Sequence, residues 1–332
     1  MKKLFLSILL LTLISNSYSL SFASARQNEA DKENTPQLRL TFFKEMEAIY
    51  QIPWYYIAAI DQFERNIQPV RKDIPEKKGL IAIYFPGEKW AGFLHPNYED
   101  TNPGRIQFFA GFGEDGDGDG KADRNNDTDV LVAYLSYLSR YGNTEENIIK
   151  ALNDYYRNET TTKIISEMAA IYRTFNTLEL YQRVFPVPKW NNYSYRSTWG
   201  DARGWGGVRI HEGTDIFAGY GTPVRSVSYG YIEILGWNKF GGWRIGIRDT
   251  NNIYYYYAHL TGFKKELKEG DVVKPGDVIG YVGSSGYGSP GTQGKFPPHL
   301  HFGMYKYNGR NEWAFDPTPY LRIWERNSKK NK

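Results

Sequence analysis

The chain changes character near residue 183, and this change constrains its fold more than any other feature. Before it, apolar residues recur at three- and four-residue spacing, as in 144–156 and 161–175, which is typical of helices packed on a core. After it, glycines separate short runs rich in Val, Ile and Tyr, such as 231–237 and 253–259, which is typical of strands. The sequence therefore predicts a multidomain protein with an N-terminal all-α domain and a C-terminal all-β antiparallel-sheet domain.

The length of the chain agrees with this division. Its 332 residues exceed what a single hydrophobic core usually organises. Pro186, Pro188 and the pair Asn191-Asn192 interrupt both patterns and indicate a linker. The expected parts are a signal peptide at 1–25, a flexible lead-in at 26–36, a helical domain at 37–183, a linker at 184–196, a β domain at 197–325 and a basic tail at 326–332.

The first 25 residues have the form of a secretory signal. Lysines at 2–3 precede an apolar run at 4–14, and the small residues at 23–25 form a cleavage site. An uncleaved anchor helix is the alternative, but polar residues within 16–19 leave the apolar run short of the roughly 20 residues of a membrane span. We therefore expect an exported, extracytoplasmic protein with no stable membrane span after cleavage.

Composition narrows the classes of function. The formal net charge of +4, from 41 basic and 37 acidic residues, is too weak to indicate a nucleic-acid partner, although it does not oppose binding to an anionic cell wall. The chain has no cysteine, which excludes disulfides, thiolate nucleophiles and cysteine–zinc sites.

Four of the five histidines lie in the expected β domain. His211 and Asp215 form H-E-G-T-D, His259 ends the run Y-Y-Y-Y-A-H, and His299 and His301 form H-L-H. Residues two apart in a strand face the same side, so the last two can address one small volume. Two imidazoles and a carboxylate would suit catalytic zinc, which takes about three protein ligands and leaves one position for water.

The H-E-G-T-D segment has an alternative interpretation, as a variant of the helical H-E-x-x-H zinc motif with Glu212 as the base. Gly213 is a poor helix residue, and Pro223 opens an expected strand shortly after it. We therefore expect Glu212 to be a solvent-facing strand residue. His95 stands alone in F-L-H-P and is expected to be structural.

The segment from His211 to 303 resembles the lysostaphin/LytM-type zinc endopeptidases, which hydrolyse peptidoglycan. The family's H-x-x-x-D is similar to the motif of His211 and Asp215, its H-x-H to 299–301, and its strand-end histidine to His259. The flanking segments 221–224 and 274–277 agree as well. The resemblance covers 197–325 and implies that the β domain is a zinc peptidase.

Residue by residue, the resemblance implies that His211, Asp215 and His301 bind Zn2+, and that His259 and His299 are the catalytic histidines. One imidazole would take the proton of the attacking water and return it to the leaving amine, while the other would stabilise the oxyanion. The sequence leaves open which histidine performs which task. The implied partner is peptidoglycan, through its stem peptides and glycan strands.

The domain order and the segment H-E-G-T-D-I-F-A look most like the sporulation-associated, LytH-type L-Ala–D-Glu peptidases of endospore formers. That likeness implies cleavage of L-Ala–D-Glu bonds in spore cortex by a secreted enzyme of the cell wall or spore intermembrane space. A zinc-free wall-binding or scaffold protein is the alternative.

Two features depart from the family pattern. The loop 286–298 is lengthened and is expected to alter the substrate groove. Trp205 stands where a tyrosine is common, which leaves Arg203 or Arg209 as candidate donors to the oxyanion or to a substrate carboxylate.

The helical half resembles lytic transglycosylases less closely. Residues 52–64 are similar to the helix that carries their catalytic glutamate, which implies a lysozyme-like domain. However, Arg65 stands where Ser or Thr is usual, and a long insertion at 67–100 separates this helix from the segment 104–108, which corresponds to their Gly-x-x-Gln-Phe element. We interpret the domain as a glycan-binding or spacing module, with glycan cleavage by Glu64 as the alternative.

An acidic loop lies within this half. Asp115, Asp117, Asp119 and Asp123 match EF-hand positions one, three, five and nine, but Asn126 stands at position twelve, where a bidentate glutamate is usual. So dense a group of carboxylates repels itself without a cation. We expect these four aspartates to bind a structural Ca2+.

Overall fold

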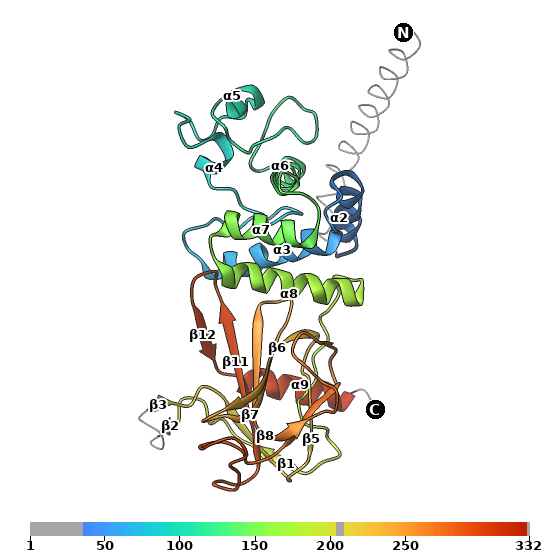
Figure 1. Ribbon diagram of the computed structural model, residues 1–332, viewed down its shortest axis with the longest axis vertical. Helices are drawn as coiled ribbons and strands as arrows, with labels where there is room; N and C mark the ends of the chain where they lie inside the picture. The colour runs from blue at the N-terminus through green and yellow to red at the C-terminus, as the bar shows by residue number, and fades with distance from the viewer. Residues whose placement is uncertain (1–35, 204–208, 331–332) are drawn as a thin grey trace. The chain divides into compact units, whose positions relative to one another are not determined.

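The computed structural model describes residues 36–203 and 209–330, so the predicted signal peptide at 1–25 lies outside the described residues. The chain divides into two compact units between Thr162 and Lys163, within helix α8 (Glu159–Phe175) (Figure 1). The expected linker at 184–196 lies inside the second unit. None of the helices in the described residues combines the length and the apolar composition that a membrane span requires.

The first unit is helical, as the sequence predicts. Its helices begin where side chains can cap them: Asn126 accepts hydrogen bonds from the N–H groups of Thr128 and Asp129, and Thr144 accepts one from Asn147. The elements up to the unit boundary are α2 (Pro36–Tyr50), α3 (Trp54–Ile67), the 3-10 turn η1 (Gln68–Val70), α4 (Gly87–Ala91), α5 (Pro103–Phe108), α6 (Asp127–Ser139), α7 (Glu145–Tyr156) and the start of α8. The predicted all-α half is confirmed as a helical region.

The second unit is built on an antiparallel sheet, which confirms the predicted fold class of this half. Its main path runs in the order β1-β4-β11-β8-β7-β6-β9. The strands of this path are β1 (Tyr193–Tyr195), β4 (Thr214–Ala218), β11 (His299–Tyr307), β8 (Ile253–Phe263), β7 (Gly242–Arg248), β6 (Gly230–Asn238) and β9 (Val272–Val273). The strands outside it are β5 (Pro223–Arg225), β10 (Val278–Val282), β12 (Glu312–Phe315) and the separate pair β2 (Ala202–Arg203) and β3 (Arg209–Ile210).

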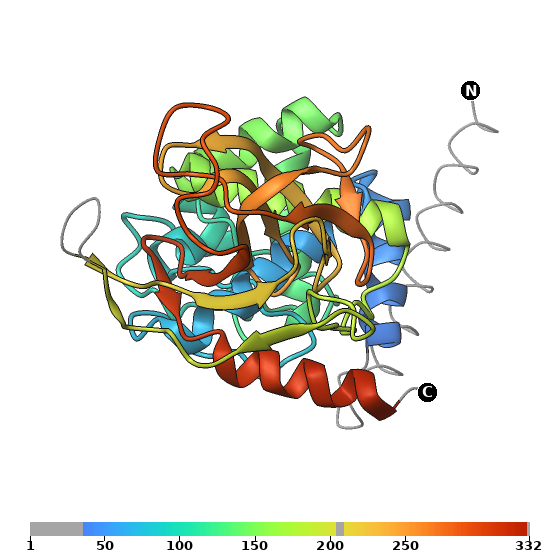
Figure 2. The ribbon, with the colours of Figure 1, turned by 90° about the horizontal axis from the view of Figure 1, so that it is seen from below.

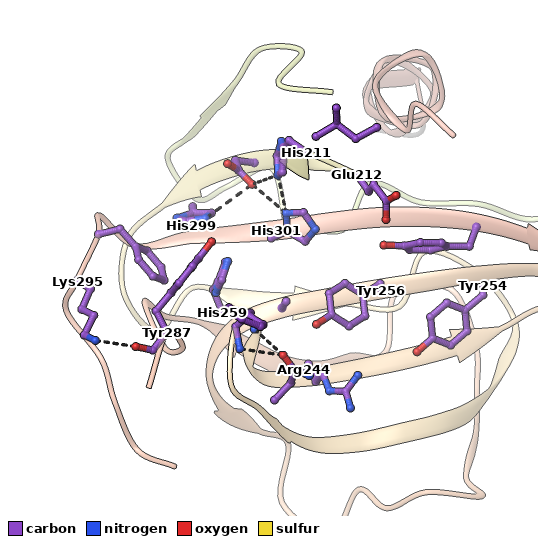
Figure 3. Close-up of a pocket in the computed structure, with 18 of the residues that line it drawn as sticks. His211, Glu212, Arg244, Tyr254, Tyr256, His259, Tyr287, Lys295, His299 and His301 are labelled. Carbon is purple, nitrogen blue, oxygen red and sulfur yellow. Dashed lines mark hydrogen bonds and ion pairs between the residues drawn. The ribbon is translucent and has the colours of Figure 1, made fainter. Parts of the chain in front are cut away.

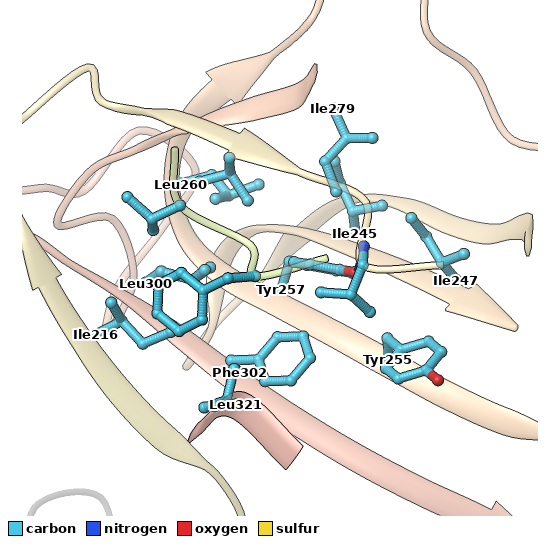
Figure 4. Close-up of a cluster of buried hydrophobic side chains, with 14 of the residues drawn as sticks. Ile216, Ile245, Ile247, Tyr255, Tyr257, Leu260, Ile279, Leu300, Phe302 and Leu321 are labelled. Atoms are coloured by element: carbon cyan, nitrogen blue, oxygen red, sulfur yellow. Dashed lines mark hydrogen bonds between the residues drawn. The ribbon is translucent and has the colours of Figure 1, made fainter. Parts of the chain in front are cut away.

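Helix α9 (Thr318–Lys330) packs on one face of this sheet, and it already includes part of the expected tail at 326–332. Its Leu321 and Trp324 join the buried core (Figure 4). Figure 2 shows the ribbon of α9 along the edge of the β unit. The hydroxyls of Tyr193 and Tyr195 on β1 donate to the two oxygens of Glu325 on α9 at 2.8 and 2.9 Å. The core therefore lies between α9 and one face of the sheet, which leaves the other face available for a site.

The period-two alternation of the strands separates these two faces. In β11, Leu300, Phe302 and Met304 are buried in the core, while His299 and His301 line a cleft on the opposite face. Strand β8 alternates in the same way, with Tyr255 and Tyr257 in the core and Tyr254 and Tyr256 on the cleft.

Substitution of Phe302 is a test of the hydrophobic core beneath the cleft. The Phe302 side chain is fully buried and packs against Tyr257 at 5.3 Å and Trp324 at 6.2 Å between ring centroids. Phe302→Ala should lower the free energy of unfolding by about 3–5 kcal/mol, because it loses apolar burial and leaves a cavity. Denaturant titration followed by tryptophan fluorescence measures this change. A midpoint equal to that of the wild type would contradict the packing described.

Candidate metal centre

His211, Asp215 and His301 come together on the cleft face of the sheet (Figure 3). Asp215 on β4 and His301 on β11 are paired residues of adjacent strands, and His211 lies just before β4. The Nε2 atom of His211 lies 2.8 Å from Nδ1 of His301 and 3.1 Å from Oδ1 of Asp215. The Nδ1 atom of His301 lies 3.1 Å from the same Oδ1. The three predicted ligands therefore offer three donor atoms to one point.

Thr198, which the sequence analysis did not single out, orients two of these ligands. Its backbone carbonyl accepts a hydrogen bond from Nδ1 of His211 at 2.7 Å, so the proton sits on Nδ1 and Nε2 keeps its lone pair. Its hydroxyl accepts a hydrogen bond from the N–H of Asp215 at 3.0 Å. Such supporting partners fix the orientation of metal ligands. The segment around Thr198 carries no motif, so no signal in the sequence pointed to it.

Gly213 permits the close approach of the ligands. A Cβ atom at this position would lie 2.5 Å from Cε1 of His301, which is too close for any side chain. The third residue of H-E-G-T-D therefore has a packing reason to be glycine.

The electrostatics of Asp215 and His301 fit a divalent cation. Burial opposes ionisation of Asp215, but its close polar contacts with His211 and His301 outweigh burial and hold its pKa well below the ordinary value. Burial lowers the pKa of His301. An ionised carboxylate and two imidazole nitrogens, largely buried and converging from one side, are what zinc requires of its ligands.

His259 and His299 lie next to this group, as the sequence predicts, with ring centroids 4.9 Å apart. The Nδ1 atom of His259 lies 2.8 Å from the carbonyl oxygen of Ser285, and that of His299 lies 2.8 Å from that of Pro297. Each carbonyl can only accept, so each histidine carries its proton on Nδ1 and keeps the lone pair of Nε2. The Nε2 atom of His299 lies 3.7 Å from Oδ1 of Asp215. Burial, followed by the neighbouring His299 and His301, lowers the pKa of His259 to about 3.

A β-bulge brings His259 into the cleft. Alternation along β8 would place it in the core with Tyr257, yet it lines the cleft together with its neighbour Ala258. Its φ of 62° is left-handed, and the register between β7 and β8 shifts at this point. Bulges re-aim side chains in this way beside active sites.

The structure also decides the alternatives for H-E-G-T-D and His95. His211 and Glu212 precede strand β4 and are not helical, so the helical zinc motif with Glu212 as base is wrong. Glu212 is exposed at the cleft and hydrogen-bonded with Tyr305. His95 belongs to the helical unit, where its Nε2 lies 3.1 Å from Oδ2 of Asp100, in keeping with its expected structural role.

The cleft has a volume of about 820 Å³ and extends from the metal centre across β11, β8 and β7. The lengthened loop 286–298 contributes Tyr287, Lys295 and Phe296 to its wall, so this departure from the family pattern does shape the groove. The ring of Phe296 lies 4.7 Å from that of His259. Trp205 and the side chains of Arg203 and Arg209 lie outside the described residues.

The acidic loop is arranged differently from the expectation. Oxygen atoms of Asp115 and Asp117 gather with Asp129, a residue that the sequence analysis did not choose, whereas Asp119 and Asp123 are not part of that group. Asp129 lies just after the EF-hand-like loop 115–126 and holds two parts of it together. Its carboxylate accepts hydrogen bonds from the N–H groups of Gly116 and Asp123 at 2.8 Å. Backbone donors therefore satisfy much of this charge.

Glu64 lies on α3 and is only 5% exposed. The hydroxyl of Tyr156 donates to its Oε1 at 2.7 Å. Burial raises the pKa of Glu64 to about 7, although this hydrogen bond opposes the rise.

Comparison with known proteins agrees with the geometry of the β unit. The family model of Peptidase family M23 matches residues 209–317. The chain is 55% identical over 326 residues to the L-Ala–D-Glu endopeptidase of Bacillus subtilis (strain 168), and the match covers 98% of both chains. It is 39% identical over 115 residues to lysostaphin of Staphylococcus staphylolyticus, covering 34% of this chain and 22% of lysostaphin.

Among solved structures, the catalytic domain of lysostaphin from Staphylococcus simulans is 35% identical, covers 40% of this chain and 93% of that domain, and has a TM-score of 0.32. The match to the Bacillus subtilis endopeptidase spans both units of the chain, including the helical region that lies outside residues 209–317. This chain belongs to Peptidase family M23.

Proposed function

We propose that this chain is a zinc-dependent endopeptidase that hydrolyses the L-Ala–D-Glu bond in peptidoglycan stem peptides. The observation that carries the proposal is the convergence of His211, Asp215 and His301 in an open cleft with two more histidines beside them. Identity of 55% over 98% of the Bacillus subtilis L-Ala–D-Glu endopeptidase supports the choice of bond. The protein would act outside the cytoplasm on the cell wall or spore cortex, after export through the segment 1–25.

The residues of the cleft suit peptide hydrolysis. A zinc ion held by the three ligands would lower the pKa of a bound water and polarise the scissile carbonyl. His259 and His299 both line the cleft and keep the lone pair of Nε2, because their protons sit on Nδ1. One of them can therefore accept the proton of the attacking water and pass it to the leaving amine. The other, when protonated at Nε2, can donate to the oxygen that becomes negative.

Digestion of defined peptidoglycan tests the proposal. Mass spectrometry should detect single L-Ala residues left on the glycan and stem peptides that begin with D-Glu. A chelator should stop this release, and added Zn2+ should restore it. Cleavage at another bond, or release that persists after the zinc has been removed, would overturn the proposal. Metal analysis of the purified protein separates it from the zinc-free scaffold alternative.

We also propose that the helical unit is lysozyme-like but serves to bind or space glycan strands. The pairing of the buried Glu64 with Tyr156 supports a structural role. The rival hypothesis, a muramidase with Glu64 as its acid, predicts that Glu64→Gln abolishes wall lysis while His301→Ala remains active.

The buried Glu64 should also make stability depend on pH. Its pKa of about 7 in the fold lies above the value of 4.5 expected when unfolded, so its contribution to stability is complete below pH 4.5 and is lost as the pH rises through 7. Glu64→Gln should flatten this fall, which for the wild type is about 3 kcal/mol. Urea titrations of both proteins at pH 4.5 and pH 8 measure the difference. Equal pH dependence in the two proteins would contradict the assignment.

A structural Ca2+ in the acidic loop remains a proposal, now centred on Asp115 and Asp117. The gathering of their oxygens with Asp129 supports it. Calorimetric titration of the metal-free protein with Ca2+ should show binding, and Asp115→Asn should weaken it. Absence of a binding signal in the wild type would end this proposal without affecting the zinc site.

A further inference from the structure

Arg244 lines the active-site cleft from β7 (Figure 3). Its neighbour Ile245 is buried in the core, so alternation turns Arg244 toward the cleft. On either side of Arg244, β7 pairs with β8 as Trp243↔Leu260 and Ile245↔Tyr257. The two β8 residues between these pairs form the bulge, Ala258 and His259, and they lie opposite Arg244. The arginine therefore lies on the face that carries the metal ligands, beside the strand of a predicted catalytic histidine.

The guanidinium of Arg244 has a buried N–H group that lacks an acceptor. Its Nε atom is shielded from solvent and makes no hydrogen bond to any described residue. Leaving such a donor unsatisfied costs free energy, which an incoming acceptor would recover. A planar guanidinium matches a carboxylate better than any other common acceptor, through two parallel hydrogen bonds.

The acidic side chains of the cleft are engaged elsewhere. Glu312 accepts a hydrogen bond from Nη2 of Arg248 at 2.9 Å. Glu212 is hydrogen-bonded with Tyr305. The buried Arg248 also pairs through its Nε with Glu233. The guanidinium of this structural arginine is thus bound by carboxylates of the protein itself. Arg244, unlike Arg248, makes no hydrogen bond from Nε to the described residues, and it lines the cleft where a substrate would lie.

We propose that Arg244 binds the free carboxylate of the D-glutamyl residue on the C-terminal side of the scissile bond. The inference rests on the proposed function, because it takes the L-Ala–D-Glu bond as the substrate. A glutamyl residue has two carboxyl groups, and only one of them can continue the peptide. The other remains a carboxylate close to the scissile nitrogen, where a specificity residue can read it.

The position of Arg244 fits this task. His301 on β11 pairs with Ala258 on β8, and Ala258 lies opposite Arg244 on β7. The backbones of His301 and Arg244 are therefore two strand spacings apart, or about 10 Å. Ala258 leaves room above the sheet for substrate between them. The D-glutamyl residue then lies over β8 and β7, and the L-Ala residue lies toward β4, where Asp215 is found.

Two synthetic stem peptides test the inference. They share the L-Ala–D-Glu bond and differ only in the free group of D-Glu, which is a carboxylate in one and a carboxamide in the other. The wild-type zinc enzyme should cleave the carboxylate peptide on the order of a hundredfold better in kcat/KM, as expected when a buried charge loses its partner. Arg244→Met should lose this preference by slowing the carboxylate peptide much more than the carboxamide peptide. Arg244→Lys should keep part of it.

Arg322→Met is the matched control, since it removes the same charge from an exposed position on α9. It should keep the full preference. Bound zinc and retained cleavage of the carboxamide peptide would show that Arg244→Met is folded. Equal cleavage of both peptides by the wild type, or an equal loss on both peptides in Arg244→Met, would overturn the inference alone. If the wild type cut neither peptide between L-Ala and D-Glu, the proposed function would fall, and this inference with it.

Discussion

Replacing His301 with alanine should eliminate peptide cleavage and zinc binding together. His301 offers one of three donor atoms that converge within 3.1 Å of one another, and only two ligands remain without it. Loss of a supporting partner of a metal ligand already weakens metal affinity by roughly 10–100-fold, and loss of the ligand itself should exceed this. Metal analysis of the purified variant and the rate of muropeptide release measure the two effects.

His95→Ala is the matched control for this experiment. It removes a buried histidine from the helical unit, where His95 contacts Asp100 rather than the cleft. The zinc content and the cleavage rate should stay at the wild-type level. If His301→Ala kept its zinc, or kept its activity without zinc, the assignment of the three ligands would be wrong.

Replacing His259 or His299 with alanine should lower kcat and leave zinc bound. Each histidine turns Nε2 to the cleft because its Nδ1 hydrogen-bonds to a carbonyl, and neither belongs to the group of three donors. Removal of a positioned proton-transfer group costs roughly 10²–10⁴-fold in rate. Single-turnover cleavage together with zinc analysis separates this result from that of His301→Ala.

The pH profiles of the two variants assign the two tasks. The variant that has lost the general base should lose the acid limb of the kcat profile, because that limb reports protonation of the base. The other variant should keep the limb at a uniformly lower rate. Loss of zinc from either protein would instead make that histidine a ligand.

In the helical unit, the local sequence pattern predicted the helices but not the boundary of the unit. Apolar spacing predicted helices at 144–156 and 161–175, and the structure has them at Glu145–Tyr156 and Glu159–Phe175. These elements follow from local periodicity and capping, which the sequence expresses directly. The same patterns placed the end of the helical part near 183, whereas the compact units divide between Thr162 and Lys163. That division depends on which unit the end of α8 packs against, and periodicity alone does not contain this information.

The sequence by itself predicted that the histidines of the β domain and Asp215 share one site, because residues two apart in a strand, such as His299 and His301, face the same side. The choice of His211, Asp215 and His301 as the metal ligands came from the resemblance to the peptidase family. The tertiary structure alone decided three other matters. A bulge with left-handed backbone turns His259 from the core to the cleft. The carbonyl and hydroxyl of Thr198 reach His211 and Asp215 from a distant segment. Within the described residues, the Nε atom of Arg244 makes no hydrogen bond, while Glu312 of the same cleft pairs with Arg248. Such pairing depends on contacts between strands far apart in the chain.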